Sequence, residues 1–281
     1  MSERAAYRRV LLDLRHAAAD RGGIRVAAEL ARLLDLDLTG VFVEDTALLG
    51  LAEYSFVREL RLPGHEWHPL DPGRIAEEVR TAADTARRLL QAHSASLGIH
   101  SLFEVVRGDP SASLAALSET GDIVVLVEPG TPSERLARAF PRAWQSALRS
   151  AAAVLLVPPR IARDHGPVAA LVTRADDPSL ATAAAIAAAA REHLLVLLPR
   201  NDAVKTAAVA AARAAGLPAA HIRTRRLHDV TPEAVRHALG ATAERLLVLT
   251  RGADGLPDTA PSHLAMARGV PVLVVEPDDA G

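Results

Sequence analysis

The chain of 281 residues carries 32 Lys and Arg against 34 Asp and Glu, which gives a formal net charge of −2. Such a balance provides no long-range field to attract nucleic acid or an anionic membrane surface. Cysteine is absent, which excludes disulfides, thiolate nucleophiles and Cys-ligated metals. Aromatic residues make up only 3% of the chain, so we expect aliphatic cores, and the length suffices for two domains.

The sequence predicts neither a signal peptide nor a membrane span. The opening residues, MSERAAYRRVLLDLRH, carry charges where a signal peptide needs an apolar core. The longest apolar run covers residues 181–190 and is shorter than the roughly 20 residues of a membrane-spanning helix. We therefore expect a soluble, cytoplasmic protein without a membrane or nucleic-acid partner.

Strand-like and helix-like segments alternate through the first part of the chain. Short apolar runs predict buried strands, and apolar residues spaced three and four apart predict helices. The predicted strands cover 7–14, 37–45, 100–106, 122–127 and 153–159. The predicted helices cover 22–35, 74–96, 110–119 and 133–150. A polar segment with several prolines, 62–73, is expected to be a loop. This alternation implies a parallel sheet with helices on both faces.

The second part repeats the same order in a shorter form. Its predicted strands cover 167–173, 194–199, 221–227, 245–250 and 270–277. Its predicted helices cover 177–192, 203–215, 231–240 and 260–268. Asp177 caps the first of these helices, and Pro178 occupies its first turn. We predict an α/β fold of two tandem five-stranded parallel-sheet domains, 1–160 and the shorter 161–281, joined by a Pro-containing, charged linker at 158–166.

The first domain resembles the opening of a universal stress protein domain. VLLDL followed by AAELARLLDLDLTGVFVED is similar to the family's succession of a strand ending in Asp, a helix, and a second strand ending in Val. Gly108-Asp109-Pro110, then Leu114, Ala115 and GDIVVL, are similar to its Gly-x-Pro, helix and strand. ALLGLAEYSFVREL resembles the version of this module in bacterial osmosensing potassium-system histidine kinases.

This resemblance covers the first domain by its residues and the second mainly by topology. It implies Rossmann- or flavodoxin-like sheets of the adenine nucleotide alpha hydrolase type, and regulation linked to stress. It also implies pairing of two domains through their last strands. A tandem protein can form that pairing within one chain, or whole chains can dimerise.

Nucleotide-binding members of this family carry Gly-x2-Gly-x9-Gly-Ser/Thr after the fourth strand. Glycines there allow backbone amides to approach phosphate oxygens at a helix N-terminus. In the first domain the last Gly-Ser pair falls on Pro141 and Arg142, and proline has no N–H to donate. An alternative register beginning at Gly130 and Ser133 retains a single glycine. Glu128 and Glu134 would also oppose a triphosphate unless Arg135 or Arg142 compensates, so we expect a degenerate phosphate loop.

Three further positions of the first domain correspond to the family's site. Asp13 ends the first strand, where the family uses a carboxylate for adenine or ribose, and Val43 would line the base pocket. Gly108 belongs to the Gly-x-Pro element after the third strand. From the residues alone we interpret Asp13 as a turn carboxylate and Val43 as a core residue.

In the second domain, Gly252-x2-Gly255 directly follows a strand and matches the first part of the motif. Nine residues further on, Ala265 and Met266 replace the Gly-Ser pair. Thr173 also stands where the first strand would end in Asp. Gly-Ala-Asp-Gly is a common turn composition, and we favour a turn over a phosphate site.

Other clusters favour structural roles. His65 and His68 flank Glu66 without an evident third ligand, so we expect a solvated loop and no metal. The arginine-rich strand at 221–227 lacks aromatic stacking partners and is typical of a charged edge strand. Trp144 is expected in a core or between domains. Gly-x-Ser-x-Gly, Walker and dinucleotide-binding signatures are absent.

The sequence thus favours a non-enzymatic stress-response regulatory protein with no cofactor. It would act through a protein partner or through self-association by its last strands. The alternative is a protein that binds ATP or AMP through a divergent loop containing Asp13, Gly130, Gly252 and Gly255. A hydrolase or ligase of the same α/β class is disfavoured because catalytic signatures are missing. Whether another small ligand fills the degenerate pocket stays open.

Overall fold

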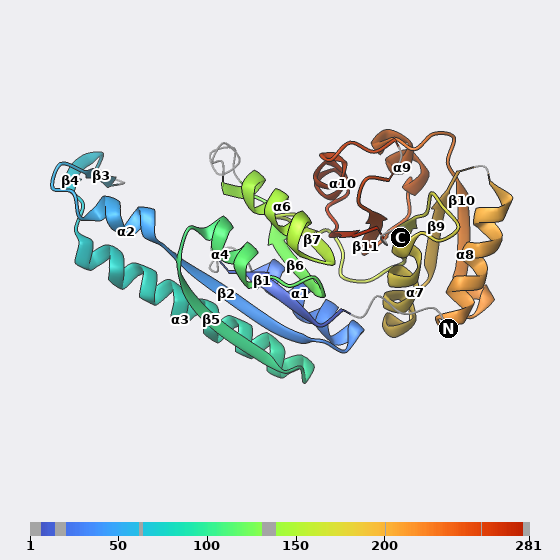
Figure 1. The fold of residues 1–281 in the computed structure, drawn as a ribbon, viewed down its shortest axis with the longest axis horizontal. Coiled ribbons are helices and arrows are strands. Elements are labelled where there is room, and N and C mark those ends of the chain that lie inside the picture. Colours follow the sequence, from blue (N-terminus) through green and yellow to red (C-terminus); the bar gives the residue numbers. More distant parts are fainter. Residues whose placement is uncertain are drawn as a thin grey trace.

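The computed structural model describes residues 7–14, 21–61, 64–130, 139–199, 201–253 and 255–277. These residues form a ten-stranded sheet with helices on both faces, and a separate two-stranded hairpin (Figure 1). The strand order is β10-β9-β8-β11-β12-β7-β6-β1-β2-β5. Every neighbouring pair in this sheet is parallel except β12 and β7. The sheet therefore consists of two parallel halves that are joined by one antiparallel pair.

The first half of the molecule ends with strand β7. Its strands in the large sheet are β1 (Arg9–Asp13), β2 (Asp37–Asp45), β5 (Ser101–Gly108), β6 (Asp122–Val127) and β7 (Ala153–Val157). Its helices are α1 (Arg21–Leu34), α2 (Thr46–Ala52), α3 (Pro72–Leu97), α4 (Pro110–Leu117) and α6 (Ala139–Ser150). The hairpin consists of β3 (Arg58–Arg61) and β4 (Glu66–Pro69).

The second half begins with strand β8. Its strands are β8 (Val168–Leu171), β9 (Leu194–Leu198), β10 (Ile222–Arg226), β11 (Leu246–Thr250) and β12 (Val272–Val275). Its helices are α7 (Pro178–Ala190), α8 (Asp202–Ala214), α9 (Pro232–Leu239) and α10 (Ala260–Arg268), with a short 3₁₀ turn at Ala219–His221.

Both halves share one strand order, 3-2-1-4-5, and they meet through their last strands. β7 and β12 pair antiparallel, with Val154 opposite Val274. Each of these two strands also has a parallel neighbour of its own half, so both lie inside the sheet. The expected boundary between residues 160 and 161 falls between β7 and β8. Independent folding of the two parts stays a prediction, because one sheet runs through both.

Local capping signals explain where several helices begin. α3, α4 and α7 each follow an aspartate and start with proline, and α9 follows a threonine in the same way. The capping side chain accepts a backbone N–H in each case, as Asp109 Oδ1 does from the Ala112 amide at 2.8 Å. Proline costs nothing at the first position because its missing N–H has no intrahelical partner there.

The two faces of the sheet carry different helices. α1, α3, α7 and α8 cover one face, where the largest aliphatic core lies, and α1 contacts α7 across the two halves. α4, α6, α9 and α10 cover the other face. There Trp144 and Leu148 of α6 pack against the cores of both halves. Trp144 therefore contributes to the junction between the halves.

One segment differs from the sequence-based expectation. A polar loop was predicted over 62–73, but strand β4 lies within that range and pairs with β3 in a hairpin that follows α2 (Figure 1). Pro69 closes the hairpin opposite Arg58, and helix α3 begins at Pro72. Most residues of the two short strands are exposed, so the hairpin has no hydrophobic pattern that the sequence could reveal.

Candidate functional site

The strand order places a candidate ligand site in each half. In an open α/β sheet, ligands bind beyond the carboxyl ends of the strands, where the strand order reverses. Here the reversal lies between β1 and β6 in the first half and between β8 and β11 in the second. Asp13 ends β1 and Gly130 follows β6, while Gly252 and Gly255 follow β11. The fold therefore assigns these four predicted residues to the two reversal points.

Two buried acidic residues lie at the first reversal point. Asp13 is only 7% exposed, and Glu128, which follows β6, is buried as well. The register places Leu12 opposite Val125, so both carboxyl groups belong to the same edge of two neighbouring strands. Gly130 is exposed directly after them. Ser133, the other predicted loop residue, lies outside the described residues.

Val43 and Gly108 lie away from the polar groups of the first reversal point. Val43 is buried in an aliphatic core with Leu114 of α4. Gly108 ends the edge strand β5, which β2 separates from β1. A Cβ atom at Gly108 would lie 2.7 Å from Ser113 Oγ of α4, a contact that rotation of the Ser113 side chain would relieve. Neither residue adds a polar group to the first reversal point.

At the second reversal point Asp177 organises a compact hydrogen-bond network. Its carboxylate accepts from the Thr173 amide at 2.9 Å and the Ser179 amide at 3.1 Å. The Ser179, Thr250 and Thr173 hydroxyls lie 2.7, 2.5 and 3.3 Å from its oxygens. Asp177 is only 6% exposed. One side chain therefore connects the end of β8, the start of α7 and the end of β11.

The Asp177 network uses the donors that a phosphate would need. A helix N-terminus with free amides attracts anions through its N–H groups and its partial positive charge. Here the amide of the first turn of α7 already donates to a carboxylate of the protein itself. A carboxylate accepts about four hydrogen bonds, so this one is saturated. The second half thus carries its own anion where a ligand anion would bind.

Gly252 and Gly255 form a turn after β11. Both have positive φ, +66° and +87°, which favours glycine. A Cβ atom at Gly255 would lie 2.3 Å from the Val230 carbonyl oxygen, whereas no atom lies within 4 Å of one at Gly252. A cavity of about 20 Å³ beside this turn is lined by Trp144, Thr250 and Ala253, among others, and has room for one water. Packing therefore accounts for Gly255 without a phosphate.

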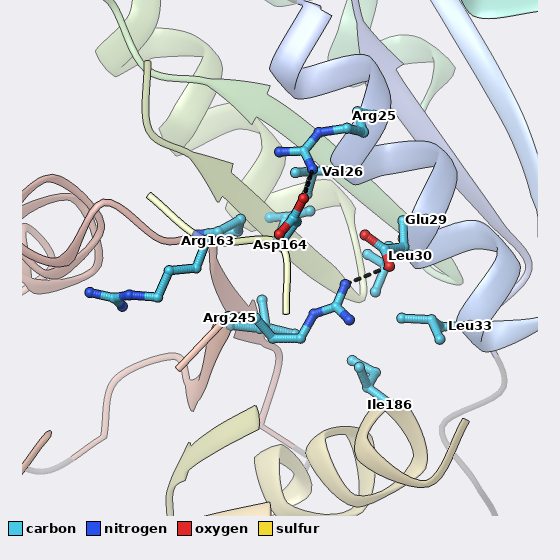
Figure 2. A pocket seen from close by; sticks show the side chains of 12 residues that line it. Arg25, Val26, Glu29, Leu30, Leu33, Arg163, Asp164, Ile186 and Arg245 are labelled. Atoms are coloured by element: carbon cyan, nitrogen blue, oxygen red, sulfur yellow. Dashed lines mark hydrogen bonds and ion pairs between the residues drawn. The ribbon is translucent and has the colours of Figure 1, made fainter. Parts of the chain in front are cut away.

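A second cavity, of about 40 Å³, lies between the halves on the α1 side (Figure 2). Arg25 Nη1 lies 3.0 Å from Asp164 Oδ2, and Arg245 Nη2 lies 2.6 Å from Glu29 Oε1. Arg163 extends away from these two pairs (Figure 2). The cavity has room for one or two waters only, and its lining arginines have acidic partners, so it is too small and too well neutralised for a nucleotide. No local sequence pattern predicts this cluster of charged residues.

Next to this cavity a fully buried carboxylate is paired with arginine. Arg268 Nε and Nη2 lie 2.6 and 2.8 Å from the two oxygens of Glu244, which has no exposed surface. Hydrogen bonding to Glu244 raises the pKa of Arg268 above its usual value. Two parallel charge-assisted hydrogen bonds fix the end of α10 to the segment before β11.

The remaining predicted clusters form no site in the described part of the chain. No group of three metal-binding side chains occurs among those residues, and His65 and His68 belong to the hairpin. β10 is the edge strand of the second half, with Arg223, Arg225 and Arg226 exposed. Within the same residues, none of the helices combines the length and the apolar character needed to cross a bilayer.

Comparison with known proteins identifies the fold. No protein-family model and no curated protein matches the sequence. A solved universal stress protein from Archaeoglobus fulgidus superimposes with a TM-score of 0.60 over 96% of this chain and 97% of that chain, at 14% identity. A Pseudomonas aeruginosa structure, also described as a universal stress protein, gives 0.52 over 98% and 95%, at 15% identity. This chain has the universal-stress-protein fold.

A third similar structure is the cytoplasmic domain of a prokaryotic cation chloride cotransporter, with a TM-score of 0.56 over 96% of each chain at 10% identity. Identities of this size establish the fold and leave the activity open. Within the universal-stress-protein fold, this chain places buried carboxylates at both reversal points: Asp13 and Glu128 in one half, Asp177 in the other.

Proposed function

We propose that this protein is a non-enzymatic stress-response regulator that acts through protein contacts and does not depend on a bound nucleotide. The Asp177 network carries the proposal. A phosphate at the second reversal point would have to displace a carboxylate that already receives two amides and three hydroxyls. It would also meet that carboxylate's negative charge at close range.

The first half supports the same proposal through its charge. Asp13 and Glu128 are buried on adjacent strands at the reversal point. Two like unit charges about 4 Å apart repel by about 4 kcal/mol at an effective dielectric constant near 20. A triphosphate beside these groups needs several compensating cations or amides. Pro141, exposed at the start of α6, has no amide N–H to donate.

The absence of enzymatic activity is likewise part of the proposal. Thr173, Ser179 and Thr250 each have a hydroxyl beside the Asp177 carboxylate, an arrangement that superficially resembles a nucleophile and its base. Ser179, however, has no exposed surface, and its hydroxyl also lies 2.9 Å from the Leu171 carbonyl oxygen. A nucleophile must reach its substrate, so we assign these hydroxyls to the stability of the second half.

ATP binding in the first half is the alternative function. One observation favours it: Asp13 lies at the carboxyl end of β1, at the reversal point where such sheets bind ligands. Gly130 follows on the neighbouring strand and is exposed. A nucleotide bound here would use a single site per chain, because the Asp177 network occupies the corresponding place in the second half.

The test is a search for nucleotide, followed by a titration. The purified protein is denatured, and the released small molecules are analysed by chromatography. The untreated protein is then titrated with millimolar ATP by calorimetry. We expect neither released nucleotide nor saturable heat. Stoichiometric nucleotide, or binding that Asp13→Ala abolishes and Thr250→Val leaves intact, would establish the alternative. ATP turnover that Asp13→Ala abolishes would contradict the non-enzymatic assignment.

A further inference from the structure

The two edges of the ten-stranded sheet differ in their protection against pairing. β10 at one edge exposes three arginines, a composition that discourages strand addition. β5 at the other edge is eight residues long and pairs, in the described part of the chain, with β2 alone. Leu102 and Val105 on β5 are 49% and 44% exposed. Its outer row of backbone N–H and C=O groups is therefore open to another strand.

Beside this edge a projecting segment exposes further hydrophobic side chains. We call residues 46–61 and 64–70, which comprise α2 and the β3–β4 hairpin, the arm; the hairpin lies at the far end of the molecule (Figure 1). Its exposed hydrophobic residues are Leu48, Leu51, Tyr54, Phe56, Leu60 and Trp67. Phe56 is 78% and Trp67 62% exposed, although both are large aromatic residues.

The arm adjoins the β5 edge through its helix α2. α2 contacts both β2 and β5. Within the arm, the Tyr54 and Phe56 ring centroids are 5.4 Å apart, and Leu60 is directly opposite Trp67 in the hairpin. Of the nine large hydrophobic side chains that are exposed in the described residues, eight lie on the arm or on β5. Met266 on α10 is the ninth.

We propose that this region binds a second copy of the chain, with the two β5 strands paired antiparallel about a two-fold axis. A two-fold interface uses the same surface on both partners, so each copy contributes its β5 edge and its arm to the contact. The six arm side chains expose on the order of 600 Å², the upper end of what a monomer leaves uncovered. Together with the β5 edge they approach the roughly 800 Å² per partner of a stable interface.

The charge of the region favours a second copy over a strongly charged partner. Residues 46–70 contain three glutamates and two arginines, a net charge of −1. On β5 the charged residues are Glu104 and Arg107, and the Arg107 guanidinium lies 2.9 Å from Glu44 of the neighbouring strand. A nearly neutral surface neither attracts nucleic acid nor repels its own copy. The inference deepens the proposed function by naming one protein contact.

The experiment measures the mass of the full chain in solution. Sedimentation of the wild type over the micromolar range is compared with that of Val105→Lys, which charges the strand edge, and Phe56→Ser, which shortens the arm. We expect a dimer whose dissociation constant rises about 100-fold or more in each variant. Met266→Ser is the matched control, because it removes an exposed hydrophobic side chain elsewhere, and it should dimerise like the wild type.

Hydrogen exchange provides a second measurement that does not depend on the variants. The β5 amides of the wild type should become better protected as the concentration rises, while the β10 amides should not change. A wild type that stays monomeric, or a dimer that is insensitive to Val105→Lys and Phe56→Ser, overturns the inference. ATP titration of the same samples separates it from the proposed function: a monomer without ATP binding overturns this inference alone, and a dimer that binds ATP overturns the nucleotide-independent function alone.

Discussion

Arg245, just before β11 in the second half, forms an ion pair with Glu29 on α1 of the first half, with Nη2 2.6 Å from Oε1. Both side chains are largely buried (Figure 2). The halves are therefore joined at two levels, by the β7–β12 ladder within the sheet and by this pair above it. Removing one partner leaves the other as an uncompensated charge in a place with little water.

We expect Glu29→Gln to lower the free energy of unfolding by about 1–2 kcal/mol, since Arg245 keeps its charge but loses its counter-ion. Urea unfolding of Glu29→Gln, Arg245→Met and the double variant should give a double variant less destabilised than the sum of the two. Asp176→Asn is the control, because its pair with Arg174 is exposed and screened by water, so its loss should leave the free energy of unfolding nearly unchanged. Additive losses would show that Glu29 and Arg245 are not coupled.

Replacing Asp177 should be more damaging than replacing an ordinary helix cap. Asp177→Ala leaves two amides and several hydroxyls without their acceptor, and we expect a loss of about 2–4 kcal/mol. Asp109→Ala removes a cap that accepts a hydrogen bond from the Ala112 amide at 2.8 Å, and should cost about 1 kcal/mol. Thermal and urea unfolding measure both. Equal losses would mean that the connections to Thr173 and Thr250 add nothing beyond the cap.

The two glycines after β11 should respond differently to alanine. Gly252→Ala places a methyl group in open space, and only its φ of +66° is unfavourable, so we expect a loss of about 1 kcal/mol. Gly255→Ala adds a collision with the Val230 carbonyl oxygen and should cost at least about 2 kcal/mol more. Unfolding curves of the two variants provide the comparison. If phosphate binding had selected these glycines, Gly252→Ala would weaken ATP binding in addition to this loss of stability.

The carboxyl group of Asp164 should titrate at low pH. A hydrogen bond from its own backbone amide lowers its pKa below the usual 3.8, and the charges of His165 and Arg25 lower it further. Because the folded-state pKa lies below the unfolded one, the stability from this group is complete above about pH 4 and is lost as the pH falls through the folded pKa. A carboxyl-carbon NMR titration measures that pKa directly.

Arg25→Gln should raise the pKa of Asp164 only part of the way to its usual value. The backbone amide, which is the largest cause of the lowered pKa, is retained in this variant. Complete return to the usual value would show that the ion pair with Arg25 is the dominant cause instead.

Much of the fold could be predicted from sequence because its signals are local. The fully apolar runs of the central strands and the Asp-Pro or Thr-Pro helix starts specified the order of strands and helices. The β3–β4 hairpin was missed because its residues are mostly exposed and carry no core pattern. That the sheet has two unequal edges, an arginine-rich one at β10 and one with exposed hydrophobic residues at β5, follows from the strand order and not from either strand's sequence alone.

The candidate sites divide in the same way. The sequence by itself determined that Asp177 caps a helix and that Gly252 and Gly255 form a turn, because capping and positive φ depend on a few neighbouring residues. Only the tertiary structure decided that Thr250, 73 residues away, donates to the same carboxylate, and that Gly255 packs against Val230. These contacts arise from strand order, which brings residues far apart in the sequence to the same edge of the sheet and which a linear pattern does not contain.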